Sequence, residues 1–396
     1  MKKKIGKLYI CPVINAMGPV TDPKHNDLLN NWAEINELML KLFNTDYRNM
    51  YLDCSGKGIV FSWFFISWSG FKFNPVHRDF GWFNIYDFYK NNWGKQMEQF
   101  GDGLYWMYNH PAKSGIGNEW GLDWLENSHY LEILMRYVAE RNYFPSVVEI
   151  VTEKNDTSHF LENFFPYDLG NRNSLDINWL ALNADGKAMY EVIDWRQATH
   201  NWQIYSPDPA NHQLGGCLNR KIGRLLDIKS VVYELKEFEI EKAFQSCLEG
   251  KDAMISAYEH DFRERSQIIL EKFIEPVNRI SKKYPEVLWL YKNSLDAFNL
   301  MSGVTDREQV NFEISIDSTG NLLIKSDRPI FGSTPFVFFA KNTTYSYVNP
   351  LRIGERAWLI YKNILEYDSI LYVACNSRAG ISTINFFELL KILKQK

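Results

Sequence analysis

The chain has 396 residues, of which 45% are hydrophobic and 23% charged, so it has the composition of a globular protein long enough for two or three domains. Its net charge of −4 and one short basic run give no support for nucleic-acid binding, and no window of 18 apolar residues predicts a membrane span. Five scattered cysteines without a CxxC motif argue against a zinc ribbon or a disulfide scaffold and favour a reducing, cytoplasmic location.

Strand-like and helix-like stretches alternate through roughly the first 260 residues. The first predicted strand, residues 7–14, precedes a helix that Asn26 or Asp27 would cap. Ser128 opens a second predicted helix, and a third carries Ile240. The remaining predicted strands span residues 58–68, 103–110, 144–151, 175–182, 230–235 and 253–260.

Short strands that alternate with helices indicate parallel pairing through right-handed crossovers. Six or seven such units predict a closed or nearly closed α/β barrel over residues 1–265, in preference to an open doubly wound sheet. No GxGxxG or Walker loop follows the first strand, which disfavours a nucleotide-binding fold.

A change of pattern follows the predicted barrel. Residues 266–307 read as a helical connector, with a kink at Pro276 and a second helix over 286–301. Short alternating runs separated by turn residues then predict an antiparallel β-sandwich over residues 308–396. This accessory domain could pack on the barrel, bind glycan or mediate oligomerisation.

Polar residues follow three predicted strands at the places where barrel enzymes hold their reacting groups. Asn15 follows the first strand, His110 follows 103–108, and His260 with Asp261 follows the last strand. The aromatic content of 15% fits sugar stacking, although large aromatic side chains also fill large cores.

In this arrangement the sequence resembles the NodB-like polysaccharide deacetylases (carbohydrate esterase family 4) over roughly residues 7–265. The resemblance rests on the first strand ending in VINAMGP, on NHPAKSG in place of an H-x-x-x-H segment, and on HDFRE after a late strand. It is closest to divergent members found among surface-polysaccharide biosynthesis genes. It implies a cytoplasmic hydrolase acting on a carbohydrate or nucleotide-sugar substrate.

In that family an aspartate and two histidines hold a divalent metal, usually zinc, a second aspartate is the general base, and the late histidine is the general acid. Here Asn15 and Met17 replace the two acidic residues, and Ser114 replaces the second histidine. Only His110 and His260 remain, so we predict that the metal site is lost and that no cofactor is required.

The resemblance and the spacing together nominate site residues. His260 is the favoured catalytic residue, with Asp261 as its orienting group or base, and His110 is an acid/base or substrate-binding residue. Asp261 could instead cap a helix, which would leave Arg263 and Arg265 on a solvated face. Asp194 is expected to support the late histidine. The predicted substrate-binding residues are Asn15, Ser114, Arg263, Arg196, His77, Arg78 and Trp82.

Three functions are compatible with these patterns. The first is a metal-free, deacetylase-like hydrolase with acid/base histidines. The second is a catalytically inactive sugar-binding or regulatory module on the same fold. The third is a glycosidase, for which Asp194, Glu259 or Asp261 would supply two carboxylates.

Overall fold

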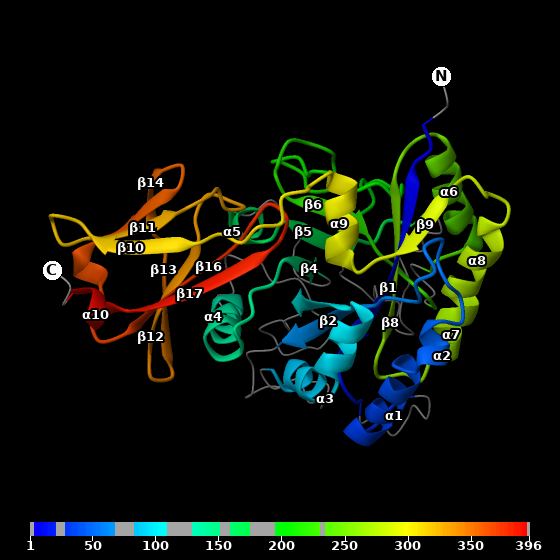
Figure 1. The fold of residues 1–396 in the computed structure, drawn as a ribbon, viewed down its shortest axis with the longest axis horizontal. Coiled ribbons are helices and arrows are strands. Elements are labelled where there is room, and N and C mark those ends of the chain that lie inside the picture. Colours follow the sequence, from blue (N-terminus) through cyan, green and yellow to red (C-terminus); the bar gives the residue numbers. More distant parts are fainter. Residues whose placement is uncertain are drawn as a thin grey trace, which may run out of the picture.

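A computed structural model describes residues 4–20, 28–67, 83–108, 129–150, 159–174, 195–229 and 234–393. The chain forms an α/β barrel and a β-sandwich that lie side by side, with the sandwich on the left in Figure 1. Within the described residues, no helix combines the length and hydrophobicity that crossing a membrane requires.

Eight parallel strands among the described residues form a nearly closed barrel in the order β6-β5-β4-β3-β2-β1-β8-β7. Because all neighbours run parallel, the carboxyl ends of the strands meet at one mouth. The strands are β1 (Lys7–Ala16), β2 (Ser62–Ser67), β3 (Gly103–Tyr108), β4 (Val147–Ile150), β5 (Tyr167–Asn171), β6 (Lys221–Arg224), β7 (Leu226–Asp227) and β8 (Ala253–His260).

The barrel is completed by one short segment that contains β6 and β7. β6 pairs with β5 on one side, and β7, one residue further along, pairs with β8 on the other. The prediction of six or seven strands was therefore too low. Strands of four and two residues are too short to show a sequence period, and β5 reads YDLGN, which is poor in strand-forming residues.

One part of the predicted connector differs from the structure. The helix expected over 286–301 begins only at Ser294, where Asn293 caps it, and β9 (Leu288–Tyr291) pairs in parallel with the amino half of β1. A π-helical turn over Leu270–Ile274 precedes Pro276, and the kink expected at that proline stays a prediction. The predicted strand 175–182 and most of 230–235 lie outside the described residues.

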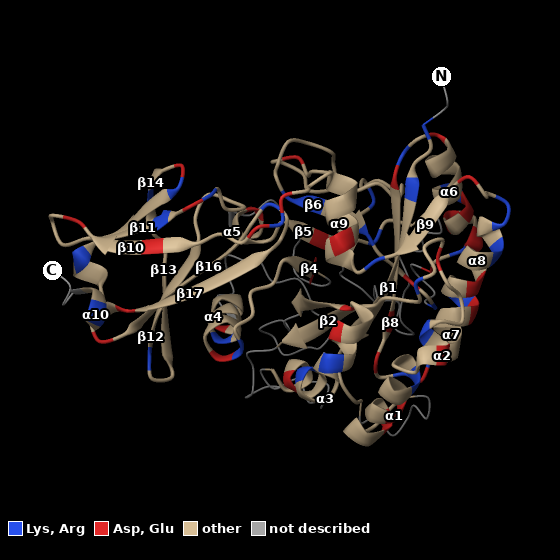
Figure 2. Cartoon of the chain, in the orientation of Figure 1, with Lys and Arg blue, Asp and Glu red and all other residues tan. Residues whose placement is uncertain are grey.

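Helices cover the outside of the barrel, and α6 (Glu237–Leu248) and α8 (Glu275–Ser281) carry charged residues of both signs (Figure 2). The first helix begins at Trp32, later than expected, because the side chain of Asn31 accepts the backbone N–H groups of residues 33 and 34. The helices are α1 (Trp32–Leu42), α2 (Thr45–Arg48), α3 (Asn84–Phe100), α4 (His129–Arg141), α5 (His159–Phe164), α6 (Glu237–Leu248), α7 (Ser266–Ile269), α8 (Glu275–Ser281), α9 (Ser294–Ser302) and α10 (Leu389–Leu393).

The predicted antiparallel strands after residue 308 are confirmed. Two four-stranded antiparallel sheets, β10-β11-β15-β14 and β13-β12-β16-β17, enclose a shared core that includes Trp358 from one sheet and Phe339 from the other. The strands are β10 (Phe312–Ile316), β11 (Leu322–Ser326), β12 (Phe336–Lys341), β13 (Thr344–Val348), β14 (Leu351–Gly354), β15 (Ala357–Ile360), β16 (Ile370–Asn376) and β17 (Ser382–Glu388). β14 was not predicted.

Strand β12 joins the sandwich to the barrel because both of its faces are buried. Val337 and Phe339 point into the sandwich core, whereas Phe336 and Phe338 belong to the barrel's apolar core. The ring of Phe336 lies 5.6 Å from that of Phe144, on the barrel side. The sandwich therefore packs on the barrel through a hydrophobic contact.

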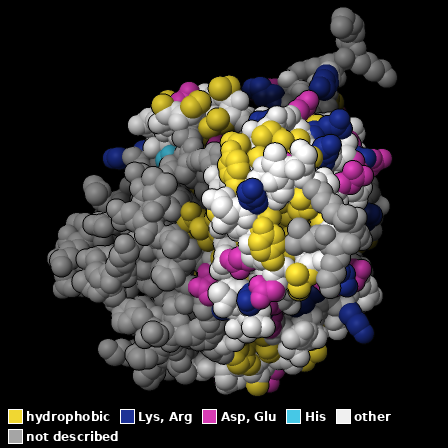
Figure 3. Space-filling view, turned by 90° about the vertical axis from the view of Figure 1, so that its left-hand side faces the viewer, with side chains coloured by type: hydrophobic (Ala, Val, Ile, Leu, Met, Phe, Trp, Pro, Cys, Tyr) yellow, Lys and Arg dark blue, Asp and Glu magenta, His cyan; other side chains and the backbone are white. Residues whose placement is uncertain are grey.

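The sandwich exposes several large apolar side chains, and Figure 3 shows apolar surface on the side of the molecule that the sandwich occupies. They include Leu351, Ile353, Tyr361, Ile364, Tyr367, Phe386 and Leu390. Oligomerisation through this domain stays a prediction.

A buried ion pair supports the amino end of the barrel, opposite the mouth. Arg48 Nη2 donates to Asp102 Oδ2 at 2.7 Å, and both side chains are fully buried. Asp102 also accepts from the indole N–H of Trp63 at 2.8 Å. We expect Asp102→Ala to lower the free energy of unfolding by about 3–5 kcal/mol, because it leaves a buried guanidinium without its counter-charge.

Urea unfolding followed by circular dichroism measures this loss. The double variant Arg48→Met/Asp102→Leu is the control, since it removes both charges, and it should recover a large part of the stability. A loss below 1 kcal/mol in the single variant would contradict the prediction.

Candidate active site at the barrel mouth

One cluster of described polar side chains at the mouth comes from five strands or the residues just after them. They are Asn15, Glu149, Arg172, Asp227, Tyr258 and His260. All are at the carboxyl ends of parallel strands, which is where barrel folds assemble reacting groups.

Glu149, on β4, lies at the centre of one half of this cluster and is fully buried. Its Oε1 accepts from Asn15 Nδ2 at 2.8 Å and from Arg172 Nη2. Arg172 also donates to the carbonyl oxygens of Leu169 and Leu225, at 3.1 and 3.2 Å, so its guanidinium is held in place. Burial raises the pKa of Glu149, and Arg172 and Asn15 oppose that increase.

Two acceptor atoms in this half are buried and have no hydrogen-bond donor among the described residues. They are Oδ1 of Asn15 and Oε2 of Glu149. A buried acceptor without a donor is costly, so these atoms favour a partner that brings hydroxyl or N–H groups.

Asp227 and Tyr258 form the other half. The hydroxyl of Tyr258 and the side chain of Asp227 are hydrogen-bonded, and Asp227 Oδ1 accepts from the backbone N–H of Lys229 at 2.7 Å. Burial, with the nearby charge of Glu259, raises the pKa of Asp227 to about 6. The ring of Tyr258 lies 4.9 Å from the guanidinium carbon of Arg172, so Tyr258 links the two halves.

His260 lies on the same rim. It is paired in register with Asn15 across β1 and β8, as expected if both serve one pocket. Its imidazole packs edge-on against Tyr258 at 5.5 Å and stacks on Phe262 at 4.7 Å. Two of the nominated residues, Asn15 and His260, are therefore neighbours at the mouth.

Asp261 instead binds the segment that follows β1. Its two carboxylate oxygens accept from the backbone N–H groups of Met17 and Gly18 at 2.8 and 2.9 Å, and from the hydroxyl of Tyr89 at 2.7 Å. The expected backbone hydrogen bonds are present, but they come from the β1 side and not from a helix start, because α7 begins only at Ser266. This geometry favours an anchoring role for Asp261.

Arg263 and Arg265 were expected to lie on a solvated face if Asp261 capped a helix, but both make contacts with neighbouring residues. Arg265 donates to Glu259 at 2.9 Å and is mostly buried. The guanidinium carbon of Arg263 lies 5.0 Å from the ring of Phe262. Arg196 is exposed beside the buried Trp195. The other nominated residues, His110, Asp194, Ser114, His77, Arg78 and Trp82, lie outside the described residues.

Sequence reasoning missed Glu149, Arg172, Asp227 and Tyr258. Glu149 carried a usable signal, since it is an acidic residue inside the apolar run FPSVVEIV. Arg172 and Asp227 carried no usable signal in the sequence, because Arg172 follows β5, Asp227 ends β7, and neither strand was predicted.

The loss of the metal site stays a prediction, because positions 110 and 114 lie outside the described residues. At position 15 the amide nitrogen of Asn15 donates to Glu149. Across the described part of the chain, no three His, Cys, Asp or Glu side chains are grouped so that they could hold a metal ion.

No protein-family model matches the chain, and no curated protein is detectably similar in sequence. A solved structure from Parabacteroides distasonis, described provisionally as a glycoside hydrolase/deacetylase, is similar with a TM-score of 0.40 and 9% identity, over 94% of this chain and 85% of that one. A modular endo-β-1,4-mannanase from Cellulomonas fimi gives a TM-score of 0.22 and 9% identity, over 94% and 76%. These likenesses concern the path of the chain alone.

Proposed function

We propose that the chain is a carbohydrate-active hydrolase that cleaves glycosidic bonds at the barrel mouth with two carboxyl groups, Asp227 as the acid and Glu149 as the base. The observation that carries the proposal is the pair itself: two buried carboxyl groups on either side of Tyr258 and Arg172. Glycoside hydrolysis requires one carboxylic acid and one carboxylate.

The environments of the two groups suit these roles. Asp227, with its pKa raised to about 6, keeps a proton into the near-neutral range and donates it to the leaving oxygen as the glycosidic bond breaks. Burial raises the pKa of Glu149 as well, but Arg172 and Asn15 oppose that increase, so we assign Glu149 as the carboxylate. It takes a proton from the water that bonds to the anomeric carbon. Proton exchange with solvent then restores both groups.

A carbohydrate substrate is supported by the rest of the rim. The rings of Tyr258, His260 and Phe262 form a continuous aromatic run, and aromatic rings pack against the C–H faces of sugars. Sugar hydroxyls would also provide donors for Asn15 Oδ1 and Glu149 Oε2. His260 is placed to bind a hydroxyl or to share in proton transfer.

Hydrolysis of an acetyl group, as in the resembled family, is the second candidate for the same mouth. The register of His260 with Asn15 favours it, because these positions correspond to the late histidine and the first-strand motif of that family. A role in surface-polysaccharide synthesis is proposed only together with this second candidate, the hydrolysis of an acetyl group.

A panel of oligosaccharides, acetylated and unacetylated, tests both candidates in a single assay of the purified chain. We expect new reducing ends without acetate release, and activity that persists after treatment with a chelator. Acetate release would favour the second candidate. Binding of sugars without any product would favour the inactive module.

The variant His260→Ala separates the role of the histidine from that of the carboxyl groups. We expect kcat/KM to fall about tenfold to a hundredfold, because His260 contributes binding and proton transfer beside the principal pair. An unchanged kcat/KM would remove His260 from the site.

A further inference from the structure

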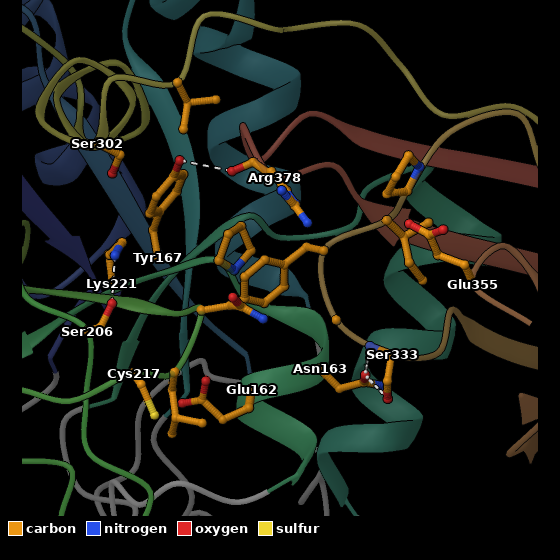
Figure 4. Close-up of a pocket in the computed structure, with 18 of the residues that line it drawn as sticks. Glu162, Asn163, Tyr167, Ser206, Cys217, Lys221, Ser302, Ser333, Glu355 and Arg378 are labelled. Atoms are coloured by element: carbon orange, nitrogen blue, oxygen red, sulfur yellow. Dashed lines mark hydrogen bonds between the residues drawn. The ribbon is translucent and has the colours of Figure 1, made fainter.

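A second polar cleft lies at the opposite end of the barrel, between the barrel and the sandwich (Figure 4). Its volume is about 670 Å³, within the range of ligand-binding sites. Tyr167 and Lys221, the first residues of β5 and β6, line one wall, and Phe331 and Arg378 line the other. It is therefore separate from the barrel mouth.

The cleft presents donors and acceptors of both charges. Arg378 is exposed, and its guanidinium has no partner among the described residues, so its N–H donors remain available. Lys221 Nζ donates to Ser206 Oγ at 2.6 Å. Glu162 Oε1 accepts from Arg220 at 2.7 Å, whereas its Oε2 is buried and has no donor among the described residues.

The two walls are fixed to each other by hydrogen bonds across the junction. Asn163 Oδ1, on the barrel side, accepts from the backbone N–H groups of Ser333 and Thr334 at 2.6 and 3.1 Å. Gly332 has a φ of +67°, and a Cβ there would lie 2.1 Å from the carbonyl oxygen of Asn163. The cleft is thus formed before a ligand binds, which lowers the entropic cost of binding.

We propose that this cleft binds a neutral oligosaccharide of about two or three sugar units. Two acidic residues, Glu162 and Glu355, line the cleft together with three basic ones, Lys221, Arg352 and Arg378. Because the opposite charges largely offset one another, a simple anion is disfavoured. An apolar ligand is disfavoured because most of the lining is polar. A sugar chain supplies both hydroxyl donors and oxygen acceptors, which matches this mixed lining. The inference does not depend on the reaction at the mouth.

Cys217 provides a direct test, because it is exposed and lines the cleft. The full chain is labelled with iodoacetamide in the presence of cellotriose, chitotriose, mannotriose or inorganic phosphate, and each cysteine is followed by mass spectrometry. At least one trisaccharide should slow labelling of Cys217 about tenfold when its concentration is ten times the dissociation constant. Labelling of Cys54, which is also exposed but does not line the cleft, should not change.

Variants then assign the protection to the cleft. Arg378→Ala and Glu162→Gln should each weaken binding of the protecting sugar about tenfold. Arg279→Ala should not, since that arginine is exposed and pairs with Glu237 on another surface. Glu149→Gln should leave the protection unchanged, which separates this site from the mouth.

The proposal is overturned if none of the three trisaccharides protects Cys217, or if phosphate alone protects it. It is also overturned if protection survives Arg378→Ala but is lost in Glu149→Gln.

Discussion

Glu149→Gln is expected to lower kcat/KM for glycan hydrolysis by about two to four orders of magnitude, the usual contribution of a positioned acid or base. Glutamine has nearly the same shape, and its amide oxygen can still accept from Asn15 and Arg172. It cannot take a proton from water. Steady-state kinetics on the substrate found in the oligosaccharide panel measure the loss.

The difficulty with this variant is that it also removes a buried negative charge beside Arg172. Glu239→Gln is a control for the lost charge, because Glu239 is equally buried and accepts from Arg224 at 2.8 and 2.9 Å, and no hydrogen bond among the described residues joins it to Glu149 or Asp227. Both variants should lose stability for the same electrostatic reason. Only Glu149→Gln should lose activity when both are assayed well below their unfolding temperatures.

Equal losses of activity in the two variants would mean that the effect comes from weakened folding. Full activity of Glu149→Gln would exclude Glu149 as the base.

The barrel could be predicted because its longest strands are apolar and separated by helices of regular spacing. β2, β3, β4 and β8 lie within predicted runs, and β1 extends its predicted run of residues 7–14 by two residues, to Ala16. The segment that completes the barrel could not be predicted in the same way. Lys221–Asp227 contains Lys, Gly, Arg and Asp, and it is a pair of strands only because β5 and β8 offer it free edges.

The error over residues 286–301 has a similar cause. Leu288–Tyr291 shows no period of its own, since LWLY suits a buried helix or a buried strand equally well. Pairing with Lys7–Ile10 of β1 decides between them, and that contact joins residues 281 positions apart in the chain.

Only part of the site was predicted, because only some of its strands were recognised in the sequence. Asn15 and His260 lie at the carboxyl ends of strands that were recognised, and they are neighbours in the structure. Glu149 and Asp227 were missed as a pair because the burial of Glu149 and the position of Asp227 depend on how the strands of the barrel close around them. Burial, and the pKa increase that follows from it, are properties of the closed barrel and not of the local sequence.

Asp227→Asn is expected to raise stability at pH 7.5 and to abolish hydrolysis of ordinary glycosides. In the unfolded chain this carboxyl has its usual pKa of 3.8, and in the folded chain burial and Glu259 raise it to about 6. Folding therefore holds the proton more tightly, so the free energy of unfolding falls as the pH rises from about 4 to about 6. Above that window the loss is about 3 kcal/mol, at 1.36 kcal/mol for each pH unit.

Asparagine cannot ionise, and it keeps an oxygen that can accept from Lys229. Urea unfolding at pH 4 and pH 7.5 should therefore give the variant a smaller decrease in stability over this range than the unmodified chain. If Asp227→Asn were instead less stable at pH 7.5, the ionised carboxylate would be favourable in the folded chain, and the assignment of Asp227 as the acid would fail.

The same proton governs activity. The kcat/KM of the unmodified chain should decline about tenfold for each pH unit above about 6, because the protonated fraction of Asp227 declines in that proportion. A glycoside with a dinitrophenolate leaving group needs no proton from the enzyme, so Asp227→Asn should cleave it at close to the normal rate. Glu149→Gln should not, since the attacking water still needs its base. The activated glycoside therefore restores the activity of Asp227→Asn but not that of Glu149→Gln. This difference distinguishes the acid from the base at a mouth where both carboxyl groups are buried.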